Sequence, residues 1–186
     1  QSNLRWDKHI QNLCNKLRSA PGRIRVEGRH FGILDRKKLF MEWCLGQIYS
    51  NGLVFLASAT QKELNSIQVA MNAGVRAIYN LPCYGYVEAS VLRSKLMLPS
   101  VETIKSRILS IEAWKRFSKN NDMVLSSGPT TRGRKNKKIP LPDLKGHKGK
   151  LFGNLLVSFW NKLPLDIKNQ ENTTGAKRGI KKMFMD

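Results

Sequence analysis

The clearest pattern of hydrophobic and polar positions lies in residues 60–82, where apolar side chains recur at steps of three and four. This spacing predicts one apolar helix face, made by Leu64, Ile67, Met71, Val75 and Ile78. Thr60 and Glu63 have the spacing of a capping box, and Pro82 predicts the end of the helix. Gly74 costs about 1 kcal/mol relative to alanine, so either a neighbouring backbone passes close to it or this turn is simply solvated.

Two helices are predicted before this one. Apolar spacing in residues 4–20 predicts an amphipathic helix with a basic flank, and Pro21 with Gly22 is expected to end it. The next stretch, residues 23–34, fits a short strand or a loop. Asp35 is expected to cap the second helix.

The second helix is expected to stop at a break in residues 50–52, Ser-Asn-Gly, which is followed by an apolar connector in residues 53–59. Beyond Pro82, the spacing predicts a short helix over 87–96 and a longer one that Ser100 opens. Five amphipathic helices joined by short breaks predict a mainly α-helical bundle.

Composition divides the chain into three parts. The helical domain is expected to cover residues 4–118, and a basic flexible linker rich in Lys, Arg, Gly, Pro, Ser and Asn follows in residues 119–150. Apolar residues return in 151–167, which fit either a helix or a buried strand and turn, and residues 177–186 fit a basic final helix or a frayed end. We expect this small C-terminal segment, residues 151–186, to pack on the helical domain.

Charge indicates the class of partner. The 186 residues include 33 Lys and Arg against 13 Asp and Glu, a net charge of +20. Such a field attracts polyanions, so nucleic acid is the first partner to consider and an anionic membrane surface the second. The alternative is a protein that is merely basic and has no polyanionic partner. We expect contacts chiefly to phosphates, from basic residues that cluster in sequence: Lys8, Arg23, Arg25, Lys37, Lys38, Arg132, Arg134, Lys135, Lys137 and Lys138.

Cysteine usage and hydropathy bear on the compartment. Cys14, Cys44 and Cys83 are odd in number and widely spaced, which argues against a secreted disulfide framework. No stretch has the roughly 20 apolar residues that a membrane span needs. The cluster in residues 132–138 also fits a nuclear-localisation signal. We therefore expect an intracellular, nuclear protein with no membrane segment.

Catalytic patterns are absent from the sequence. The acids are scattered singly rather than paired for two-metal chemistry, and His9, His30 and His147 lie apart from the cysteines. Zinc-finger spacing, a phosphate-binding loop and a nucleophile elbow are also missing. We therefore expect no metal, no cofactor and no enzymatic activity from these residues alone.

Several short motifs occur in an order that resembles the region after the polymerase core in jockey-type non-LTR retrotransposon reverse transcriptases. The resemblance spans nearly the whole chain and rests on a W-x-x-HI segment, a Q-x-x-x-x-G stretch, a helix with spaced Leu, Gln, Arg and Ile, and a WN-x-LP segment. These fall on Trp6, His9 and Ile10; Gln47 and Gly52; Leu64, Gln68, Arg76 and Ile78; and Trp160, Asn161, Leu163 and Pro164. Asn51 and Val54 depart from the Tyr and Trp of the family, which is typical of a diverged or domesticated copy.

The resemblance implies a helical thumb that packs on a template–primer duplex, followed by a basic region that helps to hold template RNA. It begins after the palm, where the catalytic aspartates of the family lie, so we expect a non-catalytic nucleic-acid-binding fragment. RNA, DNA and an RNA–DNA hybrid all stay open as partners. A protein-interaction module using Trp43, Phe159 and Trp160, or a cationic membrane-active effector, is the alternative.

Overall fold

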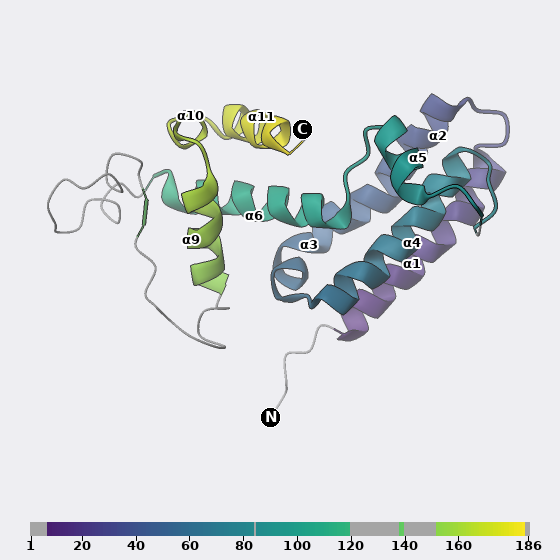
Figure 1. Cartoon of the computed structure of the whole chain (residues 1–186), viewed down its shortest axis with the longest axis horizontal. Coiled ribbons are helices and arrows are strands. Elements are labelled where there is room, and N and C mark those ends of the chain that lie inside the picture. The colour runs from purple at the N-terminus through teal and green to yellow at the C-terminus, as the bar shows by residue number, and fades with distance from the viewer. Residues whose placement is uncertain (1–6, 84, 120–137, 140–151, 185–186) are drawn as a thin grey trace, which may run out of the picture. The chain divides into compact units, whose positions relative to one another are not determined.

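The computed structural model of the protein describes residues 7–83, 85–119, 138–139 and 152–184. The regular elements within these ranges are all helices (Figure 1), which confirms the predicted mainly α-helical fold. The chain divides into two compact units, Gln1–Ile104 and Lys105–Asp186. This division falls inside helix α6 (Val101–Phe117), whereas the sequence pattern placed all of 4–118 in one domain.

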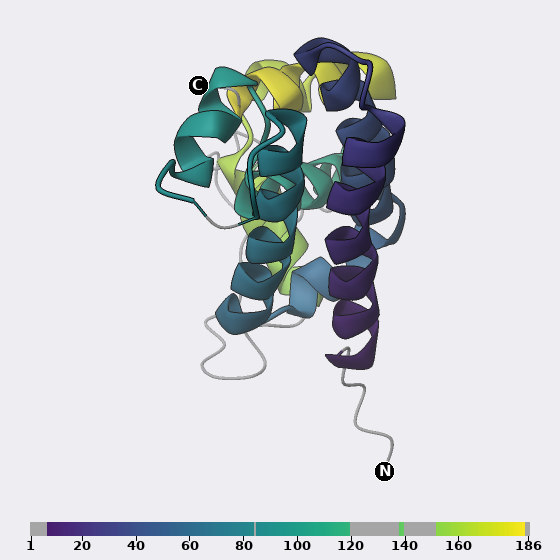
Figure 2. The same ribbon diagram turned by 90° about the vertical axis from the view of Figure 1, so that its right-hand side faces the viewer.

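The first unit is built on two helices, α1 (Asp7–Glu27) and α4 (Gln61–Ile78), which lie side by side in Figures 1 and 2. Both bury an apolar stripe, including Leu17 and Ile24 of α1 and Ile67 and Met71 of α4. The predicted capping box of α4 is confirmed: the Thr60 hydroxyl accepts from the amide of Glu63, whose carboxylate accepts from the Thr60 amide at 2.7 Å. Helix α4, which has the clearest sequence pattern, thus forms the core of the first unit together with α1.

Helix α1 runs through Pro21, so the helix end predicted at Pro21 and Gly22 is wrong. Residues 23–27, expected in a strand or loop, form its last turns. Proline removes one helical hydrogen bond and disfavours an interior position by about 3 kcal/mol. Here Leu17 and Ile24, on either side of Pro21, are both completely buried. Burial of this apolar face outweighs the local preference.

Residues 33–58 are helical throughout, as α2 (Ile33–Phe40), a π-helical turn η1 (Met41–Leu45) and α3 (Gly46–Ser58). The predicted break at 50–52 and the connector at 53–59 are therefore wrong. The buried positions Phe40, Cys44, Ile48 and Phe55 keep helical spacing across the break, and their packing overrides local turn propensity. Asp35 is not the cap of α2: Gly32 occupies that position without a side-chain hydrogen bond.

Gly74 of α4 is buried against a side chain, which corrects both explanations given for it. A Cβ atom built there would lie 2.7 Å from Cε2 of the Phe40 ring and 3.4 Å from the sulfur of Cys44. The distance to the Phe40 ring is shorter than van der Waals contact allows, whereas that to the sulfur is an ordinary contact. The glycine therefore makes room for an aromatic ring of the neighbouring helical segment, rather than for a passing backbone or a solvated turn.

Helix α4 ends at Ile78, before Pro82, because Asn80 adopts the left-handed conformation with φ of 57°. The amide of Leu81 donates to the carbonyl of Arg76 at 3.0 Å, and that of Asn80 to Ala77, which is a Schellman ending. The predicted stop at Pro82 is therefore four residues late. The predicted helix over 87–96 is α5 (Ala89–Lys95), and α6 begins after Ser100 as expected.

The second unit joins the rest of α6 to three C-terminal helices, α9 (Phe152–Lys162), α10 (Leu165–Lys168) and α11 (Thr173–Met183). The C-terminal segment was predicted to be either a helix or a buried strand and turn, and the helix is confirmed. Trp160 is buried against Phe117, with ring centroids 5.9 Å apart. The indole N–H of Trp114 donates to the carbonyl of Ile167 at 2.9 Å, which ties α10 to α6. The C-terminal segment thus packs on the last turns of α6.

Candidate nucleic-acid interface

Helix α11 presents a face that carries four cations. Lys177, Arg178, Lys181 and Lys182 are all exposed, and their side chains have no hydrogen-bond or ion-pair partner among the described residues. Their spacing places Lys177 beside Lys181 and Arg178 beside Lys182, one helical turn apart. Like charges at this spacing repel each other by a few tenths of a kcal/mol per pair. The folded helix therefore holds four uncompensated positive charges on one surface.

The opposite face of α11 fixes this surface in place. Ala176 and Ile180 are buried, and a Cβ atom on Gly179 would lie 3.1 Å from the Ile167 side chain of α10. The Asn172 side chain caps the helix by accepting from the Gly175 amide at 2.6 Å. Lys181 and Lys182 lie in the last turn, where positive charge is favoured by the helix dipole.

The WN-x-LP segment holds a distant part of the chain. Trp160 is in the core, and Asn161 forms two hydrogen bonds with the backbone of Ile139, accepting from its amide and donating to its carbonyl, both at 2.9 Å. Pro164 occupies the N-cap position of α10. Because Lys138 precedes Ile139 and is exposed, this clamp fixes the end of the predicted basic cluster against α9.

The predicted site residues of the first unit are only partly free. The guanidinium of Arg25 donates to the Leu81 carbonyl at 2.6 Å and lies 3.6 Å from the sulfur of Cys83. Arg23 pairs with Glu27 at 3.3 Å and Lys38 with Asp35 at 2.7 Å. These three cations therefore already have partners within the fold.

The remaining predicted residues divide into two groups. Lys8 is exposed and Lys37 half-buried, and neither side chain has a partner among the described residues. Arg132, Arg134, Lys135 and Lys137 lie outside the described residues. Among the described members of the predicted set, those without partners, Lys8, Lys37 and Lys138, lie in separate parts of the chain, whereas the α11 cations, which were not in the set, lie together on one helix. In the sequence, the signal that could have identified them is their spacing: successive members of the group are one, three and one positions apart.

The aromatic residues expected to meet a protein partner differ in exposure. Trp160 is only 1% exposed and cannot form a contact surface. Trp43 is half-buried, and the Arg23 guanidinium lies 4.3 Å from its ring centroid. Phe159 is half-buried with the ammonium of Lys162 5.6 Å from its ring. Cation–aromatic contacts thus cover part of both accessible rings.

The motif residues of α4 have structural contacts. Gln68 accepts from the Val101 amide at the start of α6 at 2.9 Å and donates to Asn72 at 2.8 Å. Arg76 donates to the Val87 carbonyl at 3.0 Å. Leu64 and Ile78 are buried. These contacts explain the residue types through packing and do not identify a ligand.

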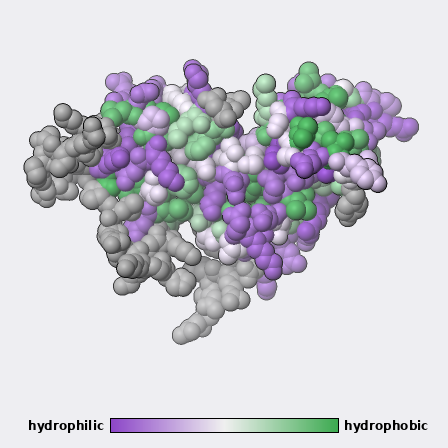
Figure 3. Space-filling view, viewed as in Figure 1, coloured by the Kyte–Doolittle hydropathy of each residue, from purple (hydrophilic) through white to green (hydrophobic). Residues whose placement is uncertain are grey.

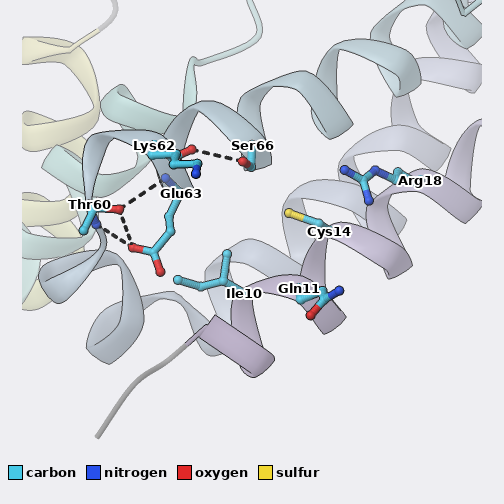
Figure 4. A pocket seen from close by; sticks show the side chains of 8 residues that line it. All are labelled: Ile10, Gln11, Cys14, Arg18, Thr60, Lys62, Glu63 and Ser66. Carbon is cyan, nitrogen blue, oxygen red and sulfur yellow. Dashed lines mark hydrogen bonds between the residues drawn. The ribbon is translucent and has the colours of Figure 1, made fainter. Parts of the chain in front are cut away.

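A groove lies between α1 and α4, with a volume of about 470 Å³ (Figure 4). Its lining combines the apolar side chain of Ile10 and the thiol of Cys14 with two cations, Arg18 of α1 and Lys62 of α4. Burial raises the pKa of the Cys14 thiol, and the nearby Arg18 charge lowers it by a smaller amount. The thiol is therefore neutral at physiological pH. Cys44, away from the groove, has its pKa raised by burial to about 12.

Within the described ranges, no group of three or more His, Cys, Asp or Glu side chains could hold a metal ion. No helix there is long and apolar enough to cross a bilayer. Comparison with protein families, with curated protein sequences and with solved structures finds no match to this chain. The resemblance to retrotransposon polymerases therefore stays a prediction.

Proposed function

We propose that this chain is a non-catalytic nucleic-acid-binding fragment, equivalent to the thumb and C-terminal region of a retrotransposon reverse transcriptase. It holds template RNA or a template–primer duplex through phosphate contacts. The observation that carries the proposal is the four-cation face of α11, on which Lys177, Arg178, Lys181 and Lys182 lack partners among the described residues.

Phosphate binding suits this face for a physical reason. A polyanion relieves the repulsion between neighbouring cations and releases condensed counterions, which is the main driving force of sequence-independent nucleic-acid binding. Lysine and arginine contacts to phosphates fix position without reading base sequence. The exposed Lys138, held close to α9 by the Asn161 clamp on Ile139, adds a further cation in the same unit.

A membrane-active function fits α11 less well. A basic amphipathic helix that lies on a bilayer inserts its apolar face between the lipids. In α11 that face is occupied, because Ala176 and Ile180 are buried in the fold. The cations alone face outward, which matches a ligand that offers charge without an apolar interior.

The test is a salt series with a double variant, Lys177→Gln with Lys181→Gln, bound to duplex RNA. Each lost phosphate contact lowers the slope of log affinity against log salt by roughly 0.9, so the expected decrease is about 1.8. Lys115→Gln with Arg116→Gln is the matched control, since both residues are exposed cations of the same unit outside the basic region 119–150, and the charge change is identical. An affinity for duplex that stays flat as salt rises, or equal losses in both variants, contradicts the proposal.

A protein-interaction function is the second candidate, because apolar side chains are exposed around α5 (Figure 3). Val87, Val91 and Met97 are 45%, 47% and 78% exposed. Exposed apolar clusters of this kind mark interaction surfaces. Capture of one defined protein that survives nuclease treatment and is lost in Val91→Asp would favour this function over nucleic-acid binding.

A further inference from the structure

The groove between α1 and α4 has positive charge at both ends. In Figure 4, Lys62 of α4 and Arg18 of α1 lie on opposite sides of Cys14. Both cations are exposed, and neither has a carboxylate partner among the described residues. The groove belongs entirely to the first unit, so it is a separate feature from the cationic face of α11.

The carboxylate in the groove does not neutralise these cations by direct pairing. Glu63 lies in the lining, but its Oε2 atom accepts from both the amide and the hydroxyl of Thr60 at 2.7 Å. The Lys62 side chain is exposed, and the Ser66 hydroxyl donates to the backbone carbonyl of Lys62 at 3.0 Å. The groove therefore carries two cations, Arg18 and Lys62, against the single carboxylate of Glu63, and its net charge is positive.

Between the two cations the lining combines the apolar residues Ile10 and Cys14 with the polar residues Gln11 and Ser66. Ile10 is 4% exposed and Cys14 is 3% exposed, and the Cys14 thiol carries no charge at physiological pH because burial raises its pKa. Gln11, which is exposed at the edge, supplies an amide that both donates and accepts. A ligand that fits the groove therefore carries two anionic groups, one for each cation, with a flat or apolar group between them.

We infer that the groove is a binding site for a single-stranded segment of nucleic acid. Successive phosphates lie at Lys62 and Arg18, and a base or sugar lies against Ile10 and Cys14. The volume of about 470 Å³ falls in the range of sites for small organic ligands, which suits one nucleotide. A duplex turns its bases inward and offers phosphates without an exposed base face, so it cannot fill the apolar part. This inference rests on the proposed function and specifies single-stranded template as the form bound here.

The experiment compares Arg18→Gln with Lys62→Gln, as a double variant, with the matched control Lys16→Gln with Lys95→Gln. The control removes two exposed cations of the same unit that do not line the groove. The probes are an oligouridine strand, an RNA hairpin duplex with the same number of nucleotides, and free uridine monophosphate. For the single strand, we expect the groove variant to lower the salt slope by roughly 1.4, since each such contact contributes roughly 0.7. For the duplex, the groove variant and the control should agree.

A second measurement locates the strand without relying on charge removal. In a Cys83→Ser background, Gln11→Cys places a reactive thiol at the groove edge, and Ser90→Cys on α5 is the control thiol. Oligouridine should slow alkylation at position 11 and leave position 90 unchanged.

The outcomes separate this inference from the proposed function. Wild-type binding that depends on α11, together with equal behaviour of the groove variant and its control, overturns the groove alone. Binding of no RNA probe overturns both. Protection of position 11 by uridine monophosphate but not by the strand also overturns the inference, because the groove would then select a free nucleotide.

Discussion

Helices α4 and α11 are both amphipathic and both have side-chain caps, yet their polar faces differ completely. Apart from Lys62, which lines the groove, the polar residues of α4 are paired with neighbours: Gln61 donates to Glu102 at 2.9 Å, Gln68 accepts from the Val101 amide, and Arg76 donates to the Val87 carbonyl. Those of α11 are four cations without a partner in the described residues. Amphipathic spacing alone therefore does not distinguish a packing helix from a binding helix.

The distinction lies in where the polar groups find their partners. Packing against α1 and hydrogen bonds to α5 and the start of α6 fix α4, so these residues are committed to the fold. Like charges on α11 disfavour the helix slightly and have an outside anion as their natural partner. Substitutions in α4 away from the groove should thus change stability, and substitutions on the outer face of α11 should change binding.

The largest expected effect is loss of core packing in α4. Ile67→Ala or Met71→Ala should lower the free energy of unfolding by about 2–5 kcal/mol, because both side chains are completely buried. Val69→Ala, in the same helix but 65% exposed, is the control and should change it by less than about 0.5 kcal/mol. Chemical denaturation measures both. RNA affinity of the folded fraction should be unchanged, and a selective loss of affinity would place these two side chains, rather than Lys62 or α11, at the binding surface.

The next effect concerns the glycine that admits Phe40. Gly74→Ala should destabilise the protein by about 1–3 kcal/mol, since the new methyl group would lie 2.7 Å from the buried ring. Gly22→Ala is the matched control, because this glycine is also helical and a Cβ atom there meets nothing within 4 Å. That control should be neutral or stabilising by up to about 1 kcal/mol. Recovery of Gly74→Ala by Phe40→Leu would identify the ring as the cause, and equal effects at both glycines would contradict the close contact.

The two caps should have similar, smaller effects. Thr60→Ala and Asn172→Ala should each cost about 1 kcal/mol, because each removes a side-chain acceptor for a first-turn amide. Amide hydrogen exchange should show the loss in α4 for the first variant and in α11 for the second. Thr60→Ser and Asn172→Asp keep the acceptor and should retain most of the protection. A loss that spreads evenly over both helices would show that the caps do not act locally.

The sequence predicted α4 well because its signals are local: a capping box and regular apolar spacing. It failed at Pro21 and at residues 50–52, where burial of residues on both sides overrides turn propensity. Arg25 was predicted to be free because its acceptor, the Leu81 carbonyl, lies 56 residues away. The groove was not foreseeable, since it exists only where α1 meets α4. Residues 132–138 were predicted as a site because basic residues are dense there in the sequence. The basic residues of α11 are recognisable only from their spacing on a folded helix.

The smallest expected change in stability comes from a substitution that stabilises the protein but weakens RNA binding. Lys177→Glu places a carboxylate one turn before Lys181, which replaces a repulsive pair with an attractive one and should stabilise the protein by roughly 0.4–1 kcal/mol. RNA affinity should fall, and its salt slope should decrease by roughly 1 or more, because a phosphate contact is replaced by repulsion. Lys177→Gln should give about half of the gain in stability. If α11 were a packing helix like α4, stability and affinity would instead change together, so opposite signs in one variant separate the two kinds of helix more sharply than either measurement alone.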